Sequence, residues 1–187
     1  MNNSIVETKT IGEYKIEIHQ DECAESPREW DNLGTMACFH SRYTLGDKHN
    51  MSIEDVIDIS ESNDYVSLPL YLYDHSGITM NTTGFSCPWD SGKVGIIYVS
   101  LEKIKKEYGN TESDTLEKVR GYLKGEVETY DNFLTGNVYG YVIKKVTQCE
   151  SCHKHDEEDV DSCFGYIGDS DECMKEAESI VNNLMKK

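Results

Sequence analysis

Two cysteines and two histidines stand within seven consecutive positions at the start of the stretch CESCHKHDEED, residues 149–159. Thiolate and imidazole are the ligands that zinc prefers, and two cysteines separated by two residues can present both sulfurs to one ion. The sequence therefore predicts a structural zinc site formed by Cys149, Cys152, His153 and His155. Such a closed site does not activate water, but it would stabilise a hairpin tip that has no hydrophobic core of its own.

Other interpretations of these residues stay open. The pattern C-x-x-C-H also occurs at covalent haem attachment sites, which require export to an oxidising compartment. A redox pair usually begins a helix, where the helix dipole lowers the thiol pKa, whereas acidic residues follow this pair. A polar turn that binds nothing is the remaining alternative. Because the four ligands are so close together, a distant residue or water could also replace one of the histidines.

The acidic composition of the chain points to a protein partner. The chain has 35 acids and 18 bases, giving a formal net charge of -17. Such a charge repels nucleic acids and anionic membranes and attracts basic proteins. Eleven acids lie between positions 150 and 178, against Lys154 and Lys175. We expect the acids that follow the Cys/His motif to bind the partner, namely Glu157, Glu158, Asp159 and Asp161. The alternative is a surface that only keeps the protein in solution.

A second set of thiols and imidazoles would suit a different class of protein, a cysteine hydrolase or another host-modifying enzyme. Its candidate residues are Cys38, His40, His75 and Cys87. Such an enzyme needs a cysteine and a histidine within hydrogen-bonding reach, and a third group that orients the imidazole. The sequence fixes no such geometry, and it lacks the phosphate-binding, dinucleotide-binding, H-E-x-x-H and G-x-S-x-G patterns. We therefore expect a protein without enzymatic activity.

The elements that must position these residues follow from hydrophobic periodicity. Alternating or β-branched runs predict strands over residues 13–20, 67–77, 92–100, 138–146 and 159–168. Apolar residues at helical spacing predict helices over residues 52–62, 101–109, 113–135 and 170–187, and Ser52 is the expected N-cap of the first. This order predicts an α+β fold, in which one antiparallel sheet has helices packed on one face. We expect a single domain, residues 1–187, with the metal-stabilised hairpin tip between its last two strands.

The start of the chain and its cysteine count bear on the compartment. The first twenty residues lack the basic and apolar regions of a signal peptide, and no stretch has the ~20 apolar residues that span a bilayer. Seven cysteines, an odd number, argue against a disulfide framework. We therefore expect a cytoplasmic protein with reduced thiols.

The chain resembles a family of small acidic proteins encoded by phages and mobile elements. The similar stretches are ESPREWDNLGTMACFHSRYTLGD, LPLYLYDHSGITMNTTGFSCPWDSGKVGIIYVS, EVETYDNFLTGNVYGYVI and VDSCFGYIG. Proteins of this kind look like anti-CRISPR proteins that inhibit type II effectors. The resemblance implies a non-catalytic protein of the host bacterial cytoplasm that binds Cas9 or its guide-RNA complex and keeps target DNA from loading. The family pattern has a shorter hairpin before VDSC, so we interpret residues 147–158 as an inserted Cys/His loop.

Overall fold

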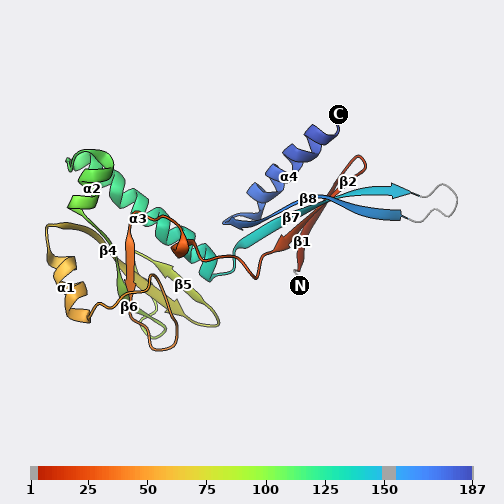
Figure 1. Cartoon of the computed structure of the whole chain (residues 1–187). Coiled ribbons are helices and arrows are strands. Elements are labelled where there is room, and N and C mark those ends of the chain that lie inside the picture. Colours follow the sequence, from red (N-terminus) through yellow and green to blue (C-terminus); the bar gives the residue numbers. More distant parts are fainter. Residues whose placement is uncertain (1–3, 149–154, 187) are drawn as a thin grey trace. The chain divides into compact units, whose positions relative to one another are not determined.

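The computed structural model describes residues 4–148 and 155–186, with the side chain of His155 left out. The chain divides into two compact units, the first formed by residues Met1–Glu25 and Gly136–Lys187 and the second by Ser26–Thr135. Each unit contains one four-stranded antiparallel sheet (Figure 1). The predicted α+β class is confirmed, but the one sheet expected from the sequence is two. That the whole chain behaves as a single domain stays a prediction.

Sheet A belongs to the first unit and is built from both ends of the chain. Its strand order is β1-β2-β7-β8, and every neighbouring pair is antiparallel. The strands are β1 (Ile5–Ile11), β2 (Tyr14–Gln20), β7 (Val138–Gln148) and β8 (His155–Ile167). Helix α4 (Ser170–Leu184) follows β8 and packs on one face of the sheet (Figure 1). The opposite face, here called the open face, is not covered by any described helix of this unit.

The core of the first unit lies between sheet A and α4. Ile16 and Ile18 of β2 and Ile143 of β7 are fully buried there. The helix contributes Ala177 and Val181, which are spaced four residues apart and therefore lie on the same side of α4. The alternation of buried and polar residues predicted along β2 thus corresponds to one face beneath α4 and one open face.

Sheet B belongs to the second unit, and its strand order is β3-β6-β4-β5. Its strands are β3 (Thr35–Cys38), β4 (Tyr65–Asp74), β5 (Ile78–Asn81) and β6 (Ser91–Ser100). The same unit contains the short 3-10 helix η1 (Pro27–Glu29) and the α-helices α1 (Ile53–Glu61), α2 (Leu101–Tyr108) and α3 (Ser113–Leu134). Helix α1 begins with the predicted Ser52 cap, which forms a reciprocal capping box with Asp55.

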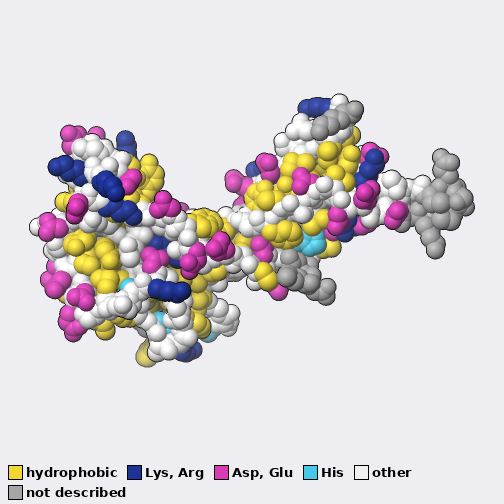
Figure 2. Space-filling model, viewed as in Figure 1, with side chains coloured by type: hydrophobic (Ala, Val, Ile, Leu, Met, Phe, Trp, Pro, Cys, Tyr) yellow, Lys and Arg dark blue, Asp and Glu magenta, His cyan; other side chains and the backbone are white. Residues whose placement is uncertain are grey.

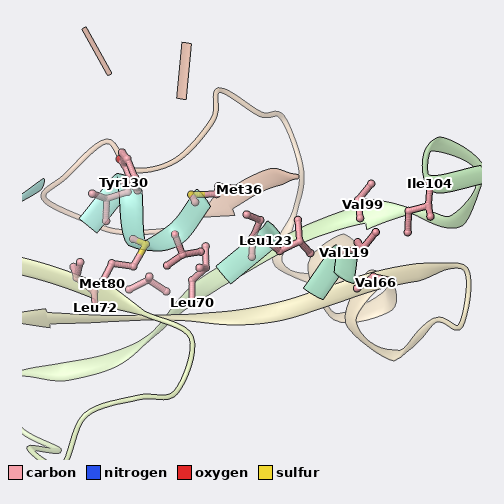
Figure 3. Packing of buried hydrophobic residues seen from close by; sticks show 14 residues of the cluster. Met36, Val66, Leu70, Leu72, Met80, Val99, Ile104, Val119, Leu123 and Tyr130 are labelled. Atoms are coloured by element: carbon pink, nitrogen blue, oxygen red, sulfur yellow. The ribbon is translucent and has the colours of Figure 1, made fainter. Parts of the chain in front are cut away.

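The larger core of the second unit lies between sheet B and α3. Val119 and Leu123 of α3 pack with Val66 and Leu70 of β4 in this cluster (Figure 3). Ile97 of β6 joins the same cluster and is fully buried.

Helix α1 covers part of the opposite face of sheet B. Ile96 is the neighbour of Ile97 along β6, so the two side chains point to opposite faces. Ile96 packs with Ala37 of β3 and Val56 of α1 in a separate, smaller cluster. The expectation that all helices pack on one face of one sheet is therefore wrong, because sheet B has buried apolar residues on both faces and a helix against each.

Three strands were not predicted. They are β1, β3 and β5, which are short or lie in segments without a clear hydrophobic period. β3 has only four residues, and it becomes a strand because it pairs with β6 far along the chain. β7 ends at Gln148 and β8 begins at His155, so the described parts of the predicted loop 147–158 belong to strands. Among the described helices, none is long and apolar enough to span a membrane.

A buried arginine fixes the irregular segment that precedes β3. The Arg28 side chain is only 3% exposed, and its Nε and Nη2 donate to the two carboxylate oxygens of Asp47, each at 2.8 Å. Its Nη1 donates to Glu126 of α3 at 2.9 Å. Both carboxylates also accept backbone N–H groups, Asp47 from Met36 and Glu126 from Leu33. The segment around η1, the start of β3 and helix α3 are therefore joined by one charged network.

We predict that Arg28→Lys strongly destabilises the protein. Lysine keeps the charge but cannot bond two carboxylates in the planar geometry of a guanidinium, and a broken buried ion pair costs about 3–5 kcal/mol. Urea denaturation should show a loss of roughly 2–4 kcal/mol. The control is Arg42→Lys, because Arg42 is 65% exposed and pairs with Asp74 at the surface. It should change stability by less than about 1 kcal/mol. Equal effects of the two substitutions would contradict this role of Arg28.

Candidate partner-binding surface

The predicted partner-binding acids lie on a sheet edge. Glu157, Glu158, Asp159 and Asp161 all belong to β8, and all four are exposed. β8 is the last strand in the order of sheet A, so its outer backbone groups have no described strand beside them. An edge strand can pair with another chain, and charged side chains on it suppress unspecific pairing.

The four acids do not share one face of sheet A. Asp161 lies opposite Ile143, which is buried beneath α4, whereas the next residue along β7 lies opposite Asp159. Residues directly opposite each other in a ladder lie on the same face, and successive residues alternate between faces. Glu158 and Asp161 therefore lie on the α4 side, and Glu157 and Asp159 lie on the open face.

Lysines neutralise part of the open face. Lys15 of β2 is 2.7 Å from Glu17 and 3.2 Å from Glu157. Lys144 of β7 is 2.9 Å from Glu17 and 3.6 Å from Glu157. Glu157 is thus engaged in a cross-strand network. No described ion pair involves Glu158, Asp159 or Asp161, and the same holds for the exposed Asp156 near the start of β8.

Glu17 is the centre of this network, and it is only 2% exposed. Burial alone would raise the pKa of its carboxyl, but the hydrogen bonds and charges of Lys15 and Lys144 outweigh that effect and lower the pKa to about 2. The ring nitrogen Nε2 of His19 lies 3.3 Å from the same carboxylate. Glu17 is therefore ionised at neutral pH and joins β2 to β7 from the open face.

Most of the predicted zinc ligands lie outside the residues that the structure describes. Cys149, Cys152 and His153 lie outside the described residues, and so does the side chain of His155. Within residues 4–148 and 155–186, no group of three or more histidine, cysteine, aspartate or glutamate side chains could hold a metal ion. The zinc site therefore stays a prediction.

The first pair predicted for a hydrolase is not arranged as a nucleophile and its base. Burial raises the pKa of the Cys38 thiol to about 12, and the nearby Asp47 adds to this effect. The Nδ1 atom of His40 instead accepts the backbone N–H groups of Arg42 and Tyr43, at 3.3 and 3.2 Å. The Cys38 thiol is thus protonated at neutral pH, and His40 organises its own loop.

The second pair meets at a carboxylate. The Cys87 thiol lies 3.7 Å from Oδ2 of Asp90, and Nδ1 of His75 lies 3.2 Å from the same oxygen. A nucleophilic cysteine needs a base that takes its proton, usually an imidazole in direct contact. Here the carboxylate stands between the two groups, so the geometry favours a hydrogen-bonded turn over a catalytic pair.

Sequence reasoning missed the Lys15–Glu17–Lys144 network. The available signal was the alternation of Lys15, Glu17 and His19 along one strand, which places three ionisable groups on one face. The sequence did not indicate which later strand would supply the second lysine, because the pairing of β2 with β7 is not local.

The comparisons with known proteins add no relative. No protein-family model matches the chain, and neither a curated protein nor a solved structure matches it.

We predict that Glu17→Gln lowers stability at neutral pH by about 2–3 kcal/mol. The folded pKa of about 2 lies below the usual value of 4.5. The stabilisation by Glu17 is therefore complete above about pH 4.5 and is lost as the pH falls from there toward 2. The stability difference between wild type and variant, measured by urea denaturation from pH 7 to pH 3, should shrink on acidification.

Glu13→Gln is the matched control. Glu13 is an exposed acid of the β1–β2 turn that pairs with Lys145 at 3.2 Å. Its replacement should cost less than about 1 kcal/mol, because an exposed ion pair contributes little. A stability difference between wild type and Glu17→Gln that stays constant over the pH range would contradict the lowered pKa of Glu17.

Proposed function

We propose that this protein is a non-catalytic inhibitor that binds a host defence nuclease of the Cas9 type and blocks the loading of target DNA. The contact surface would be the acidic edge of sheet A. The observation that carries the proposal is the set of exposed carboxylates on β8 that no described ion pair engages, namely Asp156, Glu158, Asp159 and Asp161. The positively charged channel that holds the guide–target duplex is a complementary partner for such an edge.

The distribution of charge supports a protein partner over a nucleic acid. The first unit contains 17 of the 35 acids and 8 of the 18 bases, so it has a net charge of -9. The second unit has the remaining net charge of -8. Neither unit therefore offers an excess of positive charge to phosphates, and both would be attracted to a basic protein.

The strand geometry suits imitation of a phosphate backbone. Side chains on one face of a strand recur about every 6.7 Å, because each residue advances about 3.3–3.4 Å. Each strand of duplex DNA also carries its negative charges in a regular row, so a row of alternate carboxylates along an extended strand is a comparable array. Glu157 and Asp159 have this spacing on the open face of β8, although Glu157 is shared with two lysines.

The alternative function, a Cys/His hydrolase, has less support. The raised pKa of Cys38 and the position of Asp90 between Cys87 and His75 both disfavour an activated thiol. Substituting Cys38, His40, His75 and Cys87 one at a time discriminates the two functions. A hydrolase would lose its activity while the protein stays folded, whereas a non-catalytic inhibitor would lose activity only when a substitution unfolds it.

We predict that neutralising three of the β8 acids without a described ion pair weakens binding to the Cas9–guide RNA complex. The triple variant Glu158→Gln, Asp159→Asn and Asp161→Asn leaves Glu17 and Glu157 in place, so the lysine network survives. If each charge contributes about 0.5–1 kcal/mol, the dissociation constant should rise roughly 10- to 100-fold. Wild-type binding, measured by biolayer interferometry, should also weaken as salt rises from about 0.1 to 0.5 M.

The control neutralises the same number of acids on helices α2 and α3. Glu107, Glu117 and Glu128 are exposed residues of the second unit, and their replacement by glutamine changes the net charge equally. This control should alter the dissociation constant less than about 3-fold, because it affects only the long-range field. Salt-insensitive binding, or equal losses in the two triple variants, would exclude the β8 edge as the contact surface.

We also propose that Cys149, Cys152, His153 and His155 bind one structural zinc ion that holds the tip of the β7–β8 hairpin. Protein purified without chelator should contain about one zinc per chain by elemental analysis. Cys152→Ser should lower this content, and removal of zinc by a chelator should reduce amide protection at the ends of β7 and β8 only. A zinc content near zero in the wild-type protein would remove this proposal.

A further inference from the structure

A groove lies beside α1 on the face of sheet B that α1 only partly covers. Its volume is about 490 Å³. Its apolar lining consists of Met51, Ile59, Tyr65 and Tyr98, which are all half-buried. The two tyrosine rings meet edge to face with their centroids 5.8 Å apart, and the Tyr98 hydroxyl donates to the sulfur of Met51 at 3.4 Å. The rings of Tyr65 and Tyr98 form an aromatic wall of the groove, and the contact with Met51 holds this wall in place.

Carboxylates form the rim of this groove. Asp55 and Asp58 of α1 both line it and are exposed, and no lysine, arginine or histidine is among its described lining residues. Ser52 donates its N–H and its hydroxyl to Oδ2 of Asp55, at 2.7 and 2.9 Å, which fixes this carboxylate. No described ion pair or side-chain hydrogen bond involves the Asp58 carboxylate. Figure 2 shows acidic side chains around hydrophobic ones in the region of α1.

We propose that this groove is a docking site for an arginine side chain of a basic partner protein. The apolar stem and planar guanidinium of arginine would lie along the Tyr65 and Tyr98 rings, while its N–H groups reach Asp58 and the free Oδ1 of Asp55. A cation over an aromatic ring contributes about 0.5–1 kcal/mol at an exposed site. Arginine suits this geometry better than lysine, because a flat guanidinium both stacks and bonds carboxylates with two parallel N–H groups.

The chemistry of the lining excludes other occupants. A phosphate or a nucleic acid would meet two carboxylates and no positive charge, which is repulsive. A purely apolar helix would bury Asp58 without a partner, at a substantial desolvation cost. A basic side chain with an apolar stem satisfies both the aromatic wall and the rim.

This site is separate from β8 and belongs to the other unit. It extends the proposed function only in the sense that a nucleic-acid-binding nuclease is one kind of arginine-rich partner. The groove itself requires no nuclease, so its test uses a simple probe and the intact protein. A failure of the nuclease proposal and a failure of this site can then be distinguished.

The test titrates the ¹⁵N-labelled full chain with a tetra-arginine peptide and, separately, with a tetra-lysine peptide of equal charge. Amide shifts are followed at the groove, at Met51, Asp58, Ile59, Ser62, Tyr65 and Tyr98. We expect saturable shifts at these positions and a groove dissociation constant about 3- to 10-fold lower for arginine than for lysine. Shifts at β8 report independently on the other acidic surface.

Matched variants identify the groups responsible. Asp58→Asn should weaken arginine binding at the groove about 5-fold. The control Glu61→Gln removes the same charge from α1 outside the groove and should change binding less than about 2-fold. Tyr65→Leu should weaken arginine binding and Tyr65→Phe should preserve it, because phenylalanine keeps the aromatic face.

The outcomes are decisive in both directions. Groove shifts no larger than those over the other acidic surfaces would overturn the proposal. So would equal affinity for the two peptides, or equal effects of Asp58→Asn and Glu61→Gln. The triple β8 variant should leave the groove titration unchanged, whichever partner the β8 edge binds.

Discussion

The second unit depends on the enclosure of one arginine by two carboxylates. A buried guanidinium is costly unless all its N–H groups are satisfied, and here Arg28 donates to Asp47, Glu126 and the carbonyl oxygen of Gly34. Because these acceptors lie in segments far apart in the sequence, the charge can be satisfied only when η1, β3 and α3 have come together. The irregular chain around the network thus acquires one conformation without a regular hydrogen-bond pattern of its own.

The sequence predicted the elements that have a strong local signal. The Ser52 cap, the start of α3 at Ser113 and the apolar alternation of β2 follow from short-range chemistry, and the structure confirms them. The sequence did not predict the division into two sheets, because that division depends on which strands pair when they lie far apart along the chain. Ile96 and Ile97 illustrate the difficulty: two adjacent isoleucines predict a strand, but not a helix against each face.

The sequence predicted which acids lie on the candidate surface, but it did not predict which lysines pair with them. The acids of β8 were visible in the sequence, but the lysines that engage Glu157 come from two other strands. The chain therefore has a large negative net charge, although lysines neutralise some of its acids locally. Only the remaining acids of β8 are available to a partner. The groove beside α1 had no sequence signal, because Tyr65, Tyr98 and Asp58 come from three elements.

The second unit is an insertion between two neighbouring strands of the first. β2 and β7 are adjacent in sheet A, yet residues Ser26–Thr135 separate them along the chain. The N–H of Asp21 donates to the carbonyl oxygen of Val138 at 2.8 Å, and the Gln20 side chain donates to the carbonyl oxygen of Gly136. The chain therefore leaves and re-enters the first unit at nearly one point. During synthesis, β1 and β2 can pair with each other at once, but β2 meets its second partner strand, β7, only after the whole second unit has been made. The same closeness would let a short turn replace the insert.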